Sequence, residues 1–138
     1  MLSSQELVVG SQEKSKEKIV SFQDLEVWKQ SHKYVLEIYK ICSKFPNDER
    51  YGLTSQIKRA AVSIAANIAE GFTRRSQNDK VHFYNIAQAS LHESKYYLIL
   101  AKDLNFIESN AVLWKMSEEI GKMLYGLIGS IKVNYTKR

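Results

Sequence analysis

The sequence predicts an all-α protein that folds as an antiparallel up-down-up-down four-helix bundle. Apolar residues recur at three- and four-residue steps in four long segments, which is typical of amphipathic helices. The chain has one Pro and six Gly in 138 residues, a composition that favours helix. The segments between the helices are short, so neighbouring helices must run antiparallel.

The length predicts a single domain, and a composition of 44% hydrophobic and 25% charged residues is typical of a globular protein. We expect residues 1–20 to form a flexible tail and residues 21–138 to form the bundle. The tail is polar with balanced charges, unlike a signal peptide. No apolar run reaches membrane-spanning length. The single cysteine, Cys42, excludes an internal disulfide, and we expect a cytoplasmic protein without a membrane partner.

The first helix is expected from about Ser21–Asp24, where the two side chains resemble a cap, to about Lys44. Its predicted core face is a repeat that alternates three- and four-residue steps: Leu25, Trp28, His32, Val35, Tyr39 and Cys42. Pro46 ends this helix, because proline disfavours helix in the residue before it. Asn47 or Asp48 is expected to cap the second helix.

The second helix is expected from about Glu49 to Phe72, with a core arc of Leu53, Ile57, Ala60, Ile64, Ile68 and Phe72. The third is expected to start after a cap at Ser76 or Asn78 and to reach about Leu104, with Phe83, Ala87, Leu91, Ser94, Leu98 and Ala101 inward. The fourth is expected from about Ser109 to Tyr135, with Leu113, Met116, Ile120, Met123, Leu127 and Ile131 on one face.

The segment from Gln56 to Arg74 has too little solvent face for an ordinary bundle helix. A polar stripe runs beside its apolar arc, and the rest of its circumference is small or apolar. A helix that is apolar nearly all round is normally buried nearly all round, so this helix is expected to contact another subunit. The predicted interface and polar network comprise Arg59, Val62, Ser63, Ala66, Asn67, Glu70 and Arg74. The alternative is an internal device that fixes helix register.

Basic residues surround this region, in a chain of formal charge +5 and pI about 9.2. Such a balance permits an acidic partner such as RNA or DNA, although lysines on a helix are often only solvated. The candidate nucleic-acid-binding residues are Lys29, Lys33, Lys58, Arg59, Arg74, Arg75 and Lys80. No helix-turn-helix motif or aromatic stacking platform is identifiable in the sequence.

Catalytic and metal-binding constellations are absent from the sequence. The three histidines form no Glu-x-x-His pair or HExxH motif, and no glycine-rich phosphate loop or nucleophile elbow occurs. We therefore expect no enzyme activity, no cofactor and no metal site.

Several motifs resemble one known family. Phe22–Trp28 (FQDLEVW), Phe45-Pro46, Glu49–Ala60 (ERYGLTSQIKRA) and the block Asn67–Gly71 (NIAEG) followed by Arg74 are similar to the four-helix-bundle family of 23S rRNA intervening-sequence proteins. The resemblance covers about residues 22–131. Three positions depart from the family pattern: Ala65-Ala66, where Pro is frequent, Ala89, where Gly is common, and Ser94, where Leu is usual.

The resemblance implies a ring-like homopentamer with a non-enzymatic role. A related branch of the family is the accessory protein of diversity-generating retroelements, which binds a reverse transcriptase and nucleic acid. We therefore expect a homo-oligomer that binds nucleic acid or serves as a ribonucleoprotein adaptor. The alternative is a protein–protein scaffold, with a partner such as a reverse transcriptase and no direct nucleic-acid contact.

Overall fold

The computed structural model describes residues 18–136, with side-chain environments through Ile131. Four α-helices dominate it: α2 (Glu26–Cys42), α3 (Leu53–Thr73), α4 (Gln77–Asp103) and α5 (Ala111–Thr136). Two short 3-10 turns, η1 (Phe22–Asp24) and η2 (Asn47–Glu49), precede α2 and α3. The predicted tail at 1–20 falls mostly outside the described residues. Within the described part, no helix is long and apolar enough to cross a membrane.

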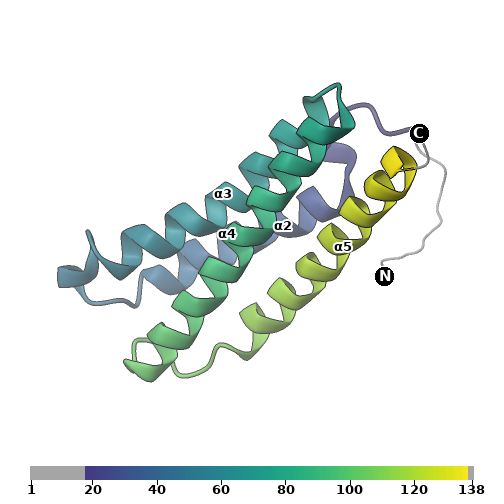
Figure 1. The fold of residues 1–138 in the computed structure, drawn as a ribbon. Helices are drawn as coiled ribbons and strands as arrows, with labels where there is room; N and C mark the ends of the chain where they lie inside the picture. Colours follow the sequence, from purple (N-terminus) through teal and green to yellow (C-terminus); the bar gives the residue numbers. More distant parts are fainter. Residues whose placement is uncertain (1–17, 137–138) are drawn as a thin grey trace.

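The helices form an antiparallel up-down-up-down four-helix bundle, which confirms the predicted fold class (Figure 1). α3 packs against both α2 and α4, and α5 closes the bundle by packing against α4 and α2. The α3–α4 connection is only three residues long, at 74–76, which holds these two helices side by side over their length.

The start of the first helix differs from the prediction. Ser21 and Asp24 do form a capping box, in which Ser21 Oγ accepts from Gln23 N and Asp24 accepts from Ser21 N. This box closes the turn η1, however, and Leu25 is extended, so α2 begins at Glu26. The turn lets Phe22 pack edge-on against Trp28, with ring centroids 5.2 Å apart.

The predicted cap of α3 at Asn47 or Asp48 is wrong. Both residues lie in η2, and α3 begins only at Leu53, behind Gly52. The first turn of α3 is capped instead by the Glu49 carboxylate, which accepts the Leu53 N–H at 3.0 Å. A glutamate four residues before the helix satisfies one of the amides that a helix start leaves unpaired.

The start of α4 agrees with the prediction, because Ser76 Oγ accepts the Asp79 N–H at 3.0 Å. At its other end, the Phe106 N–H returns to the Ala101 carbonyl at 2.9 Å, and Asn105 adopts a left-handed φ of 65°. This is the geometry of a Schellman-type helix end, and Asn is one of the few residues apart from Gly that adopts it readily.

The predicted core arc of α3 is confirmed from Leu53 to Ile68, whereas Phe72 is only half-buried and Gly71 takes the inward position. The predicted faces of the other helices are rotated by one position in places. Tyr84 is buried where Phe83 was expected, and in α5 Leu124 and Ile128 are buried whereas Met123 and Leu127 are half-buried.

The predicted core face of the first helix is only partly correct, because Cys42 is buried but the other predicted residues are not fully buried. The inward residues of α2 are Val27, Ser31, Tyr34, Ile38 and Cys42. Trp28 and Val35 are half-buried, while His32 and Tyr39 are exposed. The two faces are adjacent and both contain large apolar side chains. Burial of the observed face requires partners for the Ser31 and Tyr34 hydroxyls, and the fold provides both.

A buried hydrogen bond joins α2 to α4 across the core. The Tyr34 hydroxyl lies 2.8 Å from Ser94 Oγ, and both residues are fully buried. Ser94 uses its own proton on the Leu91 carbonyl at 2.8 Å, so the Tyr34 hydroxyl must be the donor. The Ser94 hydroxyl therefore accepts the hydrogen bond of the Tyr34 hydroxyl.

Replacing Ser94 by Ala should destabilise the protein more than replacing Tyr34 by Phe. Ser94→Ala leaves the buried Tyr34 hydroxyl without an acceptor, at a cost of about 1–3 kcal/mol, whereas Tyr34→Phe leaves Ser94 still bonded to Leu91, for about 0.5–1.5 kcal/mol. Guanidinium unfolding at one protein concentration measures both. A larger loss for Tyr34→Phe would contradict the donor assignment.

Stability should fall at alkaline pH because of the same tyrosine. Burial raises the pKa of Tyr34 to about 12, although the Ser94 hydrogen bond acts in the opposite direction. In the unfolded chain a tyrosine has a pKa of about 10, so its contribution is complete below pH 10 and is lost as pH rises toward 12, by about 3 kcal/mol in total. Unfolding at pH 8 and near pH 11 should show a smaller loss for Tyr34→Phe than for wild type. Tyr51→Phe, which changes a tyrosine that is 85% exposed, is the control and should retain the full loss.

Candidate functional site

The predicted polar stripe of α3 makes hydrogen bonds within one chain. Asn67 Nδ2 donates to the Ser63 carbonyl at 2.8 Å and to Ser63 Oγ at 3.0 Å. Ser63 Oγ in turn lies 2.8 Å from Ser90 Oγ on α4. Ser63 therefore links the stripe to α4 by a hydrogen bond. Its contribution to a subunit interface stays a prediction.

The end of the stripe lies over α4. Glu70 and Arg74 form the expected ion pair, and their side chains are 47% and 40% exposed. The Arg74 guanidinium also lies 4.7 Å from the centre of the Phe83 ring. An ion pair this exposed contributes little stability by itself, and the Phe83 ring adds a cation–π contact to the guanidinium.

Lys80 is engaged within the chain. Its ammonium donates to the Phe72 carbonyl at 2.8 Å and the Gly71 carbonyl at 3.2 Å, both of which end α3. Burial lowers the pKa of Lys80. The side chain thus pairs carbonyls that the helix end leaves without intrahelical partners. Lys80 and Arg74, both candidate phosphate-binding residues, therefore already have local partners for their charges.

An apolar surface covers the outside of the α2–α3 pair, and we call it the α2–α3 strip. It contains a hollow of about 280 Å³. Val62 is 42% exposed here, and Leu36 and Tyr39 on α2 are 50% and 46% exposed. The residues that line the hollow are Phe22, Trp28, His32, Val35, Val62, Ala65, Ala66 and Ala69.

The sequence predicts only the α3 half of the α2–α3 strip. Val62 and Ala66 were predicted as interface residues, but Trp28, His32 and Val35 were assigned to the core. A sequence signal for these residues was available, because α2 has two adjacent apolar faces. That is more apolar surface than a single bundle can bury. An apolar surface of this kind is typical of an interaction site, and its role in assembly stays a prediction.

The predicted basic residues fall into three groups. Lys29 and Lys33 are exposed on the outer side of α2. Lys58 and Arg59 lie on α3, with the Lys58 ammonium 4.6 Å from the centre of the Tyr39 ring. Arg75 is exposed in the α3–α4 turn, next to Arg74 and Lys80. Lys58 therefore lies beside the Tyr39 ring of the α2–α3 strip, and the third group lies at one end of the bundle.

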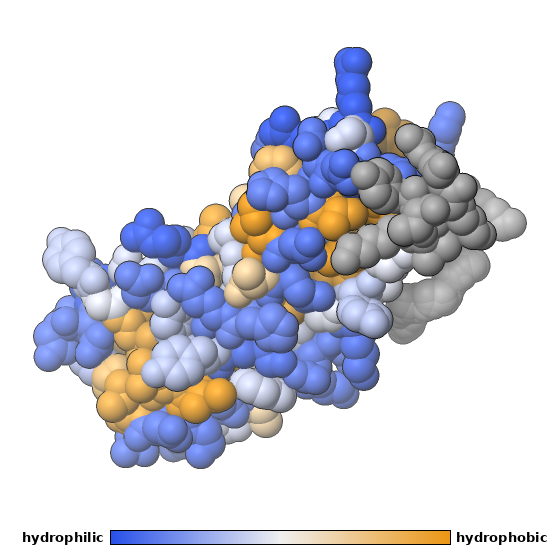
Figure 2. All heavy atoms as spheres, viewed as in Figure 1, coloured by the Kyte–Doolittle hydropathy of each residue, from blue (hydrophilic) through white to orange (hydrophobic). Residues whose placement is uncertain are grey.

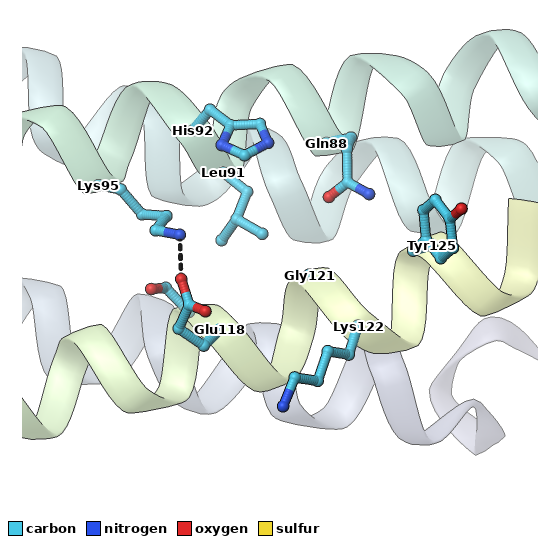
Figure 3. Close-up of a pocket in the computed structure, with 9 residues that line it drawn as sticks. Gln88, Leu91, His92, Lys95, Glu118, Gly121, Lys122 and Tyr125 are labelled. Carbon is cyan, nitrogen blue, oxygen red and sulfur yellow. Dashed lines mark hydrogen bonds and ion pairs between the residues drawn. The ribbon is translucent and has the colours of Figure 1, made fainter.

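A second hollow, of about 330 Å³, lies between α4 and α5 (Figure 3). Lys95 and Glu118 reach toward each other across it and form an ion pair, while Lys122 points away from α4. The Lys95 hydrogen bond lowers the pKa of Glu118, and the Lys95 ammonium also lies 4.7 Å from the centre of the Trp114 ring. The two charged groups that face each other across this hollow, Lys95 and Glu118, therefore already form an ion pair.

Two further observations concern metal binding and the reactivity of the cysteine. In the described residues, no group of three or more His, Cys, Asp or Glu side chains could hold a metal ion. The buried thiol of Cys42 has a pKa raised to about 11 by burial, against the opposing effect of the Lys58 charge. Since the thiolate is the reactive form, this cysteine is inert near neutral pH.

Comparison with known proteins identifies the family. The family model described as 23S rRNA-intervening sequence protein matches residues 23–126. The chain belongs to this family. A solved structure is similar over 74% of this chain and 97% of its own, with 28% identity and a TM-score of 0.69. It is a protein of unknown function from the S23 ribosomal protein family of Bacteroides thetaiotaomicron. No curated protein matches the chain.

The region matched to the 23S rRNA-intervening sequence family contains both the polar stripe and the α2–α3 strip. The block Asn67–Gly71, which carries the resemblance in the sequence, lies where α3 meets α4. Asn67 bonds within α3, and Gly71 lies directly against the Tyr84 ring. In this member of the family, Gly71 of the block leaves room for the Tyr84 ring of α4 against α3.

Proposed function

We propose that this protein is a non-enzymatic homo-oligomer that binds nucleic acid, or acts as a ribonucleoprotein adaptor, through basic residues beside its assembly surface. The observation that carries the proposal is the α2–α3 strip with exposed lysines at its border. Following the family resemblance, we propose five copies in a ring. We also propose a cytoplasmic location, because the chain has a single cysteine and no internal disulfide.

Assembly is supported by the apolar character of the strip. Val62, Ala66 and Ala69 present small side chains, which allow a second helix to approach closely. On α2, Trp28 and Val35 remain half-buried in one chain. Covering these side chains with another copy would remove apolar surface from water, at about 25 cal/mol for each Å².

Nucleic-acid binding is supported by the basic residues that border the α2–α3 strip. Lys29 and Lys33 extend from the outer side of α2, and Arg59 from the outer side of α3. A subunit that covers the apolar hollow would leave this basic border in water. A cyclic assembly would repeat these basic side chains around its axis and so multiply the contacts with phosphates.

A salt titration tests the nucleic-acid half of the proposal. Binding of RNA and DNA oligonucleotides should weaken steeply with salt, with a log–log slope of about −0.9 for each phosphate contact on duplex DNA and about −0.7 on single strands. The double variant Lys29→Gln/Lys33→Gln should make the slope less negative by about 1.8 on duplex DNA and about 1.4 on single strands, per binding site. Lys102→Gln/Lys115→Gln, which removes two exposed lysines from α4 and α5, is the matched control. No binding at low salt, or binding without a salt slope, would refute this half.

A second candidate function is a scaffold for another protein, such as a nucleic-acid polymerase. The observation in its favour is a set of exposed apolar side chains around the α4–α5 connection: Ile99, Leu104 and Val112, of which Val112 is 72% exposed. Figure 2 shows apolar side chains gathered at this end of the α4–α5 face, within a mainly polar surface. Recovery of one specific protein partner after nuclease treatment, abolished by Val112→Glu, would favour this function.

A further inference from the structure

The hollow between α4 and α5 continues toward the C-terminal end of α5. A further space of about 330 Å³ adjoins it, and Gln88 and Tyr125 line both. Asn85, Ile128 and Gly129 complete the lining of this further space. A Cβ atom at Gly129 would meet nothing within 4 Å, so the α5 wall is open there. We call the two spaces together the α4–α5 groove.

The described residues leave the α4–α5 groove without a cover. From Met123 to Ile131, α5 has no charged residue, and Tyr125 on this stretch is 78% exposed. Figure 2 shows apolar side chains between α4 and the C-terminal half of α5. An uncharged helix face of this kind is normally covered.

The groove also contains an unused hydrogen-bond acceptor. Gln88 points from α4 toward α5, and its Oε1 atom is buried without a hydrogen-bond partner among the described residues (Figure 3). A buried acceptor without a donor is unfavourable, so an occupant of the groove should bring an N–H or O–H group as well as apolar side chains.

The chain that precedes Lys18 contains a segment with both properties. Leu7-Val8-Val9 is the one run of three apolar residues before Ile19, and polar residues flank it on both sides. Each residue of the run carries a backbone N–H group that can donate to a side-chain amide oxygen.

This segment is long enough to reach the groove. Because the bundle is antiparallel, Lys18 lies at the end where α4 starts and α5 ends (Figure 1). Val8 is ten residues earlier, a span of up to about 33–36 Å when extended. From Thr136 to Gly129, α5 is only seven residues, or about 10 Å, and each helix crossed adds about 8–10 Å.

The order of the charges fits the same direction of approach. A chain that enters from this end passes Gly129 first and Lys122 afterwards, just as the apolar run is followed, toward the N-terminus, by Glu6. Lys122 is exposed and points away from α4, and no ion pair between described residues involves it. A glutamate is therefore complementary to the charge at the far end of the groove.

We propose that Leu7-Val8-Val9 binds in the α4–α5 groove of its own chain, with a backbone N–H donating to Gln88 Oε1 and with Glu6 beside Lys122. The α4–α5 groove and the α2–α3 strip are lined by different helices, so this contact and assembly through the strip are compatible. The inference goes beyond the proposed function and does not depend on it.

Hydrogen exchange of the full-length protein, read by mass spectrometry, tests the contact. The peptide that contains Leu7-Val8-Val9 should exchange at least about 10-fold more slowly than the same synthetic peptide free in solution. Gly129→Leu fills the groove and should return exchange to the rate of the free peptide. Gly126→Leu, at an exposed position of α5 outside the groove lining, is the matched control and should keep the protection.

Two results of this experiment would overturn the inference. Exchange at the free-peptide rate in the wild-type protein would show that the groove holds only water or a different ligand. Protection that persists in Gly129→Leu would show that the segment binds elsewhere on the molecule.

A mixture of two variants distinguishes the groove of the same chain from that of a neighbouring copy. Leu7→Ser/Val8→Ser keeps the groove and loses the apolar run, whereas Gly129→Leu keeps the run and loses the groove. When the two chains are coexpressed, the intact run should stay unprotected, and its mass distinguishes it from the substituted one. Recovery of protection would place the run in a neighbour's groove and overturn binding within one chain. A monomeric wild-type protein would contradict the proposed assembly but would leave these expected results unchanged.

Discussion

Replacing Ala66 by Glu should convert the assembled protein to monomers while leaving its helix content unchanged. Ala66 is exposed on α3 and lines the hollow of the α2–α3 strip. In the proposed assembly, the new carboxylate would be buried in an apolar contact without a partner. The cost of such a buried charge is several kcal/mol, so the subunit dissociation constant should rise at least about 100-fold.

Light scattering and circular dichroism at micromolar concentration measure this outcome together. The matched control is Ala89→Glu, which places the same charge at an exposed alanine of α4. Because both substitutions are on exposed positions of a helix, neither should unfold a single chain. If the Ala66→Glu protein assembles like wild type, the α2–α3 strip is not the contact.

The second large effect is expected at Gly71. A Cβ atom placed there would lie 2.6 Å from Tyr84 Cε1 and 2.9 Å from Cδ1, and the Tyr84 ring is buried between the helices. Gly71→Ala should therefore force α3 and α4 apart and destabilise the protein by about 1–3 kcal/mol, although alanine is normally the better helix residue.

Gly126 on α5 provides the matched comparison. A Cβ there would meet nothing within 4 Å, so Gly126→Ala should stabilise the protein by about 0.5–1 kcal/mol through helix propensity alone. Chemical unfolding of both variants at one protein concentration gives the two changes. A Gly71→Ala protein as stable as the Gly126→Ala protein would show that the Tyr84 ring can move away at no cost.

The helices could be predicted because their periodicity is strong and their loops are short. The face of α2 could not, because two adjacent faces compete. The observed face includes Ser31 and Tyr34, whose polar groups make burial costly unless they are paired. The acceptor for Tyr34 is Ser94, sixty residues away in the sequence. A partner at that distance is set by tertiary packing and leaves no trace in local periodicity.

The candidate site was predictable in part for a similar reason. Val62 and Ala66 could be identified because α3 has more apolar circumference than a bundle needs. The position of Trp28 and His32 on this surface could not be predicted, because the periodicity of the first helix favours both residues as core. The sequence predicts Lys80 as a nucleic-acid-binding residue, but the three-residue turn brings its ammonium to the carbonyls of Gly71 and Phe72. Local sequence patterns show which residues are polar, but the tertiary fold determines which of them already have hydrogen-bond or ion-pair partners.

The most direct test of the central claim, assembly through the α2–α3 strip, is the molar mass of the wild-type protein in solution. Light scattering at micromolar concentration and physiological salt should give several times the 15.9 kDa of one chain. Five copies would match the ring that we propose. A mass of 15.9 kDa across that concentration range would contradict the account, because the strip would then be exposed to water with no subunit to cover it.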